Sequence, residues 1–198
     1  TLEGKGDHCY IFVADSIDYI TQETIDDYVD QFDNNIYPNN TDFYSSEFDI
    51  DQNNRLTVLI EEMGGVQNGG IIMGYFWGKD FFTQDQLDAM GWNVQSNKAD
   101  MVYLNGHALQ EGWKPEDHFG TLAHEFQHEQ WWYKTWKNGY LWKSADEGWK
   151  PTTWINEGMS TYAEQLNGYT TTDGRVYCYF DEYVGVETSD ASLLNWNQ

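Results

Sequence analysis

The stretch TLAHEFQHEQWW, residues 121–132, places two of the five histidines of this 198-residue chain four positions apart. Four residues turn an α-helix through about 400°, so His124 and His128 lie about 40° apart on one helical face. At that separation two imidazoles can bind one metal ion at about 2.0–2.1 Å. Glu125 lies about 100° further round the helix, where its carboxylate can reach a water molecule beside the ion. On a helix, this stretch therefore predicts a metal site.

The flanking residues indicate that the stretch is helical. Pro115 suits a first turn, and Glu116 and Asp117 complement the positive end of the helix. The pair Asn138-Gly139 is typical of a helix stop. Apolar residues recur between these ends: Phe119, Leu122, Phe126 and Tyr133. We expect a core helix over residues 115–137.

A third metal ligand is expected from WINEGMSTYAEQL, residues 154–166. Its apolar residues have helical spacing, which puts Glu157 in the first turn of a second core helix. A hydrolytic zinc site needs three protein ligands and one open position for water. Two neutral imidazoles and one carboxylate leave the ion a net positive charge, which acidifies that water. Glu157 is the predicted third ligand, and Glu164, Asp146 and Glu147 are the alternatives.

Composition limits the class of protein. The length fits one domain, 1–198, which we divide into an N-terminal lobe with the metal helix, 1–137, and a C-terminal lobe supplying the third ligand, 138–198. The net charge of -23 repels nucleic acid and anionic lipid and attracts divalent cations and basic substrates. The sequence contains no run of about 18 apolar residues, so we expect no membrane span. We expect a monomer that binds no nucleic acid.

The remaining pattern predicts strands alternating with helices. Strands are expected over residues 9–16, 55–61, 71–77 and 99–104. The segment 21–38 is expected to form a helix, with Thr21 as its N-cap and Pro38 just beyond its last residue. A second, short helix is expected over 83–91, with a Thr83/Gln86 capping box.

The segments AHEFQH and WINEGMSTYAE resemble the gluzincin metallopeptidases, whose third zinc ligand is the glutamate of an Asn-Glu-Gly type segment. Within these, the chain is most similar to the hyicolysin family of secreted neutral zinc metallopeptidases. The resemblance extends upstream through VADSIDYITQETIDDYVDQFDNNIYP, DIDQNNRLTVLIEEM and MVYLN, so it spans most of residues 10–166. The departures are EQWW after the second histidine and a tryptophan-rich insert before Glu157, which bear on substrate preference.

This resemblance implies that His124, His128 and Glu157 bind zinc and that Glu125 is the general base. The fold it implies is a zincin-like α+β domain, with a mixed sheet and an antiparallel edge strand over the zinc helix, and a helical C-terminal lobe. The expected activity is a secreted zinc endopeptidase whose peptide substrate adds to the edge strand. Five residues are candidates for the oxyanion donor: Tyr162, Tyr169, Tyr179, Tyr183 and His107.

Two other functions remain open. One is an acidic, tryptophan-rich extracellular binding module whose zinc is structural or whose catalysis is lost. The other is zinc-dependent hydrolysis of an ester or amide that is not a peptide bond. Hydrolysis of a protein substrate would separate both from the endopeptidase.

Two further features predict stabilising links. Asp49, Asp51 and Asn53 alternate like the start of a calcium loop, although Asn54 and Ile60 stand where an EF-hand has glycine and glutamate. A short calcium-binding turn is expected there, against the alternative of an Asx-rich turn entering a strand. Cys9 and Cys178 would form a disulfide in an oxidising compartment.

Overall fold

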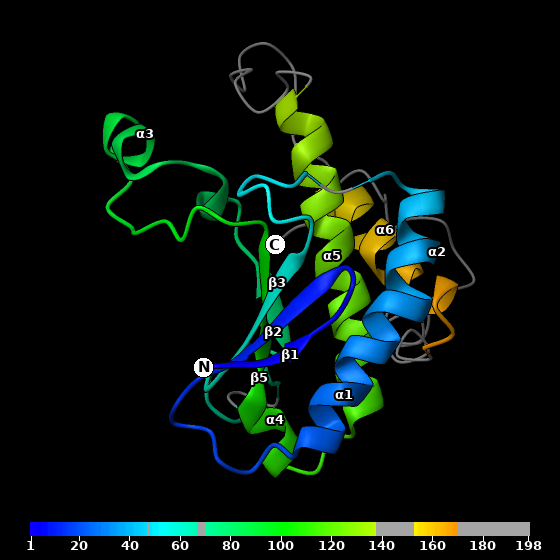
Figure 1. Ribbon diagram of the computed structural model, residues 1–198. Helices are drawn as coiled ribbons and strands as arrows, with labels where there is room; N and C mark the ends of the chain where they lie inside the picture. Colours follow the sequence, from blue (N-terminus) through cyan, green and yellow to red (C-terminus); the bar gives the residue numbers. More distant parts are fainter. Residues whose placement is uncertain (47, 67–69, 138–152, 170–198) are drawn as a thin grey trace, which may run out of the picture.

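The computed structural model describes residues 1–46, 48–66, 70–137 and 153–169, which form an α+β fold (Figure 1). A mixed five-stranded sheet has the order β1-β2-β3-β5-β4. The inner strands β2, β3 and β5 are parallel, and the edge strands β1 and β4 are antiparallel to their neighbours. The prediction of a mixed sheet with an antiparallel edge strand is therefore confirmed. The strands are β1 Leu2–Lys5, β2 Cys9–Val13, β3 Leu56–Glu61, β4 Gly74–Phe76 and β5 Met101–Asn105.

The main helices gather on one side of this sheet (Figure 1). Helix α1 (Gln22–Gln31) packs on β1 and β2, and α5 (Pro115–Lys137) packs on β4 and β5. Helix α6 (Thr153–Leu166) packs along α5, and α2 (Tyr37–Phe43) contacts both. The shorter helices are α3 (Gln84–Ala89), α4 (Gly106–Gln110), the π-helical turn η1 (Phe32–Ile36) and the 3-10 turn η2 (Gly78–Phe81). Of the helices in the described ranges, none has the length and apolar character needed to span a membrane.

The core lies between the sheet and the helices. Alternate residues of β2 and β3 are buried, as expected for strands with one face against helices. They meet the apolar stripe predicted for α5, of which Phe119, Leu122 and Phe126 are buried in the same cluster. Burial of this stripe fixes how α5 is rotated, and so fixes where its histidines point.

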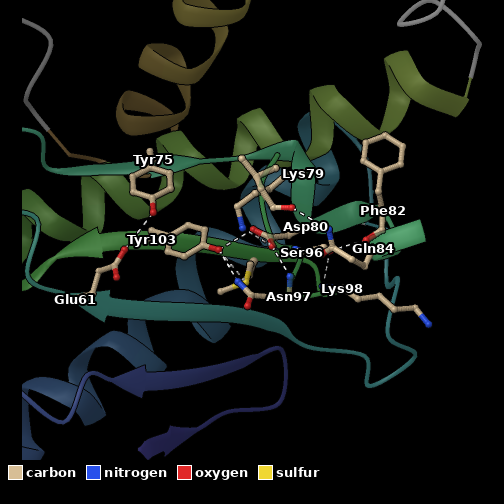
Figure 2. A network of polar contacts seen from close by, with 12 residues as sticks. Glu61, Tyr75, Lys79, Asp80, Phe82, Gln84, Ser96, Asn97, Lys98 and Tyr103 are labelled. Carbon is tan, nitrogen blue, oxygen red and sulfur yellow. Dashed lines mark hydrogen bonds and ion pairs between the residues drawn. The ribbon is translucent and has the colours of Figure 1, made fainter. Parts of the chain in front are cut away.

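A buried polar network attaches the segment between β4 and β5 to the other face of β5 (Figure 2). The Tyr103 hydroxyl donates to Asp80 Oδ2 at 2.6 Å, and Lys79 Nζ lies 2.8 Å from Asp80 Oδ1. The Asn97 amide also donates to Asp80, and the rings of Tyr75 and Tyr103 stack at 4.4 Å. Asp80 thus links Lys79 and Asn97 to Tyr103 of β5, and the stacked Tyr75 ring adds a contact from β4.

Several element boundaries differ from the sequence prediction. The helix predicted to end before Pro38 continues to Phe43. At η1 the hydrogen bonds span five residues instead of four, so the Tyr37 amide donates to the Phe32 carbonyl. The missing N–H of Pro38 then falls at the start of a new helical segment, where it leaves no gap. Strand β1 was not predicted, and the strands expected over 9–16 and 71–77 are shorter. The helix at 83–91 and its capping box are confirmed.

Part of the sequence prediction falls outside the described residues. The segments 138–152 and 170–198 make up most of the proposed C-terminal lobe and include Cys178. Cys9 is buried on β2, and burial raises the pKa of its thiol. The disulfide remains a prediction.

Candidate metal centre

The centre lies where α5 and α6 face one another. Helix α5 carries His124, Glu125 and His128, and its position on the sheet turns the two histidines toward Glu157 of α6. Glu157 is on the second turn of α6, not the first, because α6 begins at Thr153. The structure thus brings together the two histidines and the glutamate that the sequence predicts as ligands.

The three side chains converge on one point. Oε2 of Glu157 lies 3.5 Å from Nε2 of His124, and Oε1 lies 3.7 Å from Nε2 of His128. The imidazole rings are 4.8 Å apart and nearly perpendicular. His124 is buried and His128 is partly buried, whereas the Glu157 side chain is 54% exposed, so the point where they meet opens to solvent on one side.

These distances fit a zinc ion. Atoms bound at about 2.0–2.2 Å by a tetrahedral ion lie about 3.3–3.6 Å from one another. The two measured nitrogen–oxygen distances match this separation to within a few tenths of an ångström. Two imidazole nitrogens and one carboxylate, with one side open to water, are also the ligand set of hydrolytic zinc sites.

The other face of His124 contacts α6 as well. Its Nδ1 lies 2.7 Å from Oε1 of the buried Glu164. This contact favours the tautomer with hydrogen on Nδ1 and leaves Nε2 as the metal-binding nitrogen. Ser160 Oγ lies 3.0 Å from Nε2, but its hydroxyl has the Glu157 carbonyl as an acceptor at 2.9 Å, so Nε2 stays available.

Electrostatics couples the three groups. Burial lowers the pKa of His124, but the contacts with Glu157 and Glu164 outweigh this and raise the pKa to about 9. The contacts with His124 and His128 hold the pKa of Glu157 well below its ordinary value. His124 therefore carries a proton at neutral pH, and a metal ion at Nε2 would have to displace it.

Glu125 lies beside this cluster and under the edge strand. Its side chain is buried, and burial raises the pKa of its carboxyl even though the nearby histidines lower it. The backbone amide of Phe76, on β4, hydrogen-bonds to it. Glu125 is thus held between the metal-ligand cluster and β4.

A ladder of asparagine contacts holds α6 against α5. The buried Asn40, on α2, donates to the Ala123 carbonyl at 3.1 Å and accepts from Asn167 Nδ2 at 2.7 Å. Asn167 follows α6 and also accepts from Asn39. Since Ala123 precedes His124, the ladder links α6 to α5 next to the candidate ligands.

The remaining sequence candidates lie elsewhere. Of the alternative third ligands, Glu164 contacts Nδ1 and not the open side of the pair, and Asp146 and Glu147 are outside the described residues. Tyr162 packs on Phe43, Tyr169 bonds to Asn35 and Gln31, and His107 contacts Glu62 and Glu111. Tyr179 and Tyr183 are not described. The oxyanion donor therefore stays unassigned.

Sequence reasoning missed Ser160 and Asn40, and it considered Glu164 only as an alternative third ligand, not as a partner of His124. One signal was present: Glu157, Ser160 and Glu164 are spaced i, i+3, i+7, which places them on one helical face. Their contact with His124 depends on how α6 packs on α5, which this spacing does not specify. Asn40 gives no sequence signal of its role.

Two histidines and a glutamate converge from two helices, and these are the donor types found in hydrolytic zinc sites. The chain is 25% identical over 203 aligned positions to the neutral metalloprotease ShpI of Staphylococcus hyicus, a match that covers 99% of this chain. The match covers 42% of the relative, so the chain spans less than half the length of that protein. No family model matches the chain. The likeness supports a metalloprotease family.

Proposed function

We propose that this chain is a zinc-dependent endopeptidase of the hyicolysin-like gluzincin type, with His124, His128 and Glu157 as zinc ligands. The observation that carries the proposal is the approach of Glu157 to both Nε2 atoms, at 3.5 and 3.7 Å, with Glu125 buried beside them. The relative's name agrees with this class of activity.

The ion and the chain would divide the chemistry. Bound zinc would lower the pKa of a coordinated water and polarise the carbonyl of the scissile bond. Glu125 would accept the proton of the attacking water and pass it to the nitrogen of the leaving amine. Burial supports this role because it raises the pKa of Glu125, and a carboxylate with a raised pKa is a stronger base.

The position of β4 supports a peptide substrate. Strand β4 is the last strand on its side of the sheet, so in the described part of the chain its outer edge has no partner strand. Phe76 of β4 contacts Glu125 directly, which brings that edge close to the general base. An extended peptide that pairs with this edge would place its backbone carbonyl near the reacting groups.

Casein hydrolysis tests the proposal. The purified chain should cleave casein, lose this activity with a zinc chelator and regain it with zinc. Glu125→Gln should keep near-stoichiometric zinc while its rate falls by about 10²–10⁴, since glutamine cannot accept the proton. Glu129→Gln, one turn along α5, is the matched control and should retain activity if circular dichroism shows it folded.

Two results would contradict the proposal, the first its mechanism and the second its activity. If Glu125→Gln cleaves casein at the wild-type rate, the general base is wrong. If the folded protein binds zinc but cleaves no protein substrate, the binding module with structural zinc is the better description of the chain.

A further inference from the structure

A second cluster of carboxylates lies at the ends of two neighbouring strands. The loop that carries Asp49 and Asp51 leads into β3, and Asp100 directly precedes β5. These strands are parallel neighbours, with Thr57 opposite Met101, so their first residues meet at the same end of the sheet. Carboxylate oxygens of the three aspartates all lie within 4.8 Å of one another.

The loop is shaped by its own aspartates. Asp49 accepts from the backbone amides of Asn53 and Asn54, at 2.9 and 3.1 Å, and Asp51 accepts from the amide of Asn53 at 3.1 Å. Gln52 and Asn54 have left-handed backbones, with φ of 62° and 59°. Each of these bonds occupies one lone pair of its oxygen, so the carboxylates keep lone pairs for a cation.

Asn53 contributes to the shape of this loop. Its side-chain oxygen accepts from the Arg55 amide at 2.7 Å, and its side-chain nitrogen donates to Asp51. Asn53 therefore helps to hold the loop in shape, and Asp100, distant in sequence, adds a third carboxylate beside Asp49 and Asp51.

The buried carboxylate of Asp100 indicates that this cluster binds a ligand. Asp100 is fully buried, and its Oδ1 accepts a hydrogen bond from the Ile50 amide at 3.2 Å. Its Oδ2 is also buried and has no hydrogen-bond partner. An unpartnered buried carboxylate oxygen is costly. A proton on Oδ2 would not remove this cost, because it would leave a buried donor without an acceptor.

Among the described residues, no positive side chain forms an ion pair with the cluster. The ion pairs of the described residues include none of Asp49, Asp51 and Asp100. The Arg55 guanidinium, the closest basic group in sequence, donates to the Gly6 carbonyl and lies over the Tyr10 ring. Burial and the charges of Asp51 and Asp49 raise the pKa of Asp100 to about 8, as expected when like charges crowd one another.

We propose that Asp49, Asp51 and Asp100 bind a calcium ion that clamps the loop before β3 to the start of β5. Three carboxylates with only oxygen donors suit a hard cation. Calcium fits better than magnesium because it accepts irregular geometry, and the partly exposed loop leaves room for water ligands. The clamp would stabilise β5, whose neighbour β4 contacts Glu125.

Calorimetric titration of the purified chain with calcium chloride tests the site. We expect one calcium per chain with a Kd on the order of 10⁻⁴ M or tighter, and a melting temperature that rises with calcium. Asp51→Asn should weaken binding about tenfold or more, since ligand charge sets the affinity. Asp88→Asn, an exposed aspartate on α3, is the matched control and should bind like the wild type.

Asp100→Asn separates the clamp from a purely structural role of Asp100. The pKa of about 8 leaves the Asp100 carboxyl mostly protonated at neutral pH, and an asparagine amide resembles a protonated carboxyl in size and polarity. Without calcium this variant should therefore be about as stable as the wild type, yet calcium should no longer raise its melting temperature. Extracellular calcium sites have Kd values of about 10⁻⁴–10⁻³ M, so about 5 mM calcium should fill the site. The proposal is overturned if the wild type binds no calcium at that concentration, or if Asp100→Asn binds calcium as well as the wild type. Equal stabilisation by magnesium would overturn the choice of calcium.

Discussion

Glu164 on α6 contacts Nδ1 of His124 on α5 at 2.7 Å, while Nε2 of the same ring faces Glu157. One imidazole is therefore held between two glutamates, one on the buried side and one on the open side. Partners of this kind fix the ring orientation and the tautomer of a metal-binding histidine.

Removing this contact should weaken zinc binding. Glu164→Ala frees the His124 ring, so we expect zinc affinity to fall by about 10–100-fold. Glu164→Gln keeps an acceptor oxygen without the charge, and its affinity should lie between alanine and wild type. Competition with a coloured chelator measures this. Gln165→Ala, on the exposed neighbouring position, is the control, and equal affinity of Glu164→Ala and wild type would contradict the positioning role.

Zinc binding should release a proton from the protein. The pKa of His124 is about 9 in the absence of metal, so its imidazole is protonated at pH 7.5 and must lose that proton when a metal binds Nε2. Titration calorimetry in buffers of different ionisation enthalpy measures this release. The observed binding enthalpy, plotted against the ionisation enthalpy of the buffer, should have a slope that corresponds to about one proton per zinc. An enthalpy independent of the buffer would contradict the account.

The parts of this site that the sequence predicts are the parts set by local rules. The caps and apolar stripe of α5 define a helix, and helical geometry then places His124 and His128 on one face. The position of Glu157 opposite them follows from packing between helices that are distant in sequence. Nothing local to Glu164 or Asn40 reports which helix it will face, so neither could be predicted from its neighbours.

The same limit explains the errors in the fold. Strand β1 has the sequence LEGK, which has no apolar alternation, and it forms because its backbone pairs with the edge of β2. The proximity of Asp100 to Asp49 cannot be predicted until β3 and β5 are known to be neighbours. Pro38 predicts a helix end correctly for a regular α-helix, and the π-helical turn is the exception that lets the chain continue.

The buried Asn40 should matter for stability. Asn40→Ala removes the bonds to the Ala123 carbonyl and to Asn167, and leaves polar groups buried without these partners, so we expect a loss of about 1–3 kcal/mol. Asn34→Ala, an exposed asparagine of the same segment, should change stability by no more than about 0.5 kcal/mol. Urea unfolding measures both, and equal effects would refute the role of the asparagine ladder.

His118 should make the fold sensitive to acid. Burial lowers the pKa of this histidine to about 4, and its Nδ1 lies 2.8 Å from the Tyr28 hydroxyl. The unfolded chain binds a proton near pH 6.5 and the folded chain only near pH 4, so stability falls as pH drops through this window, by up to about 3 kcal/mol. In His118→Gln the free energy of unfolding should depend less on pH between 6.5 and 4. An unchanged dependence would show that other groups cause it.

Anomalous diffraction at the zinc absorption edge, from crystals of the zinc-loaded chain, tests the metal centre most directly. We expect one strong peak between α5 and α6, at about 2.0–2.2 Å from Nε2 of His124, Nε2 of His128 and a carboxylate oxygen of Glu157. The peak should disappear in crystals of Glu157→Ala grown at the same zinc concentration. A zinc peak on other residues, or full occupancy between the two histidines in Glu157→Ala, would contradict the assignment of the three ligands.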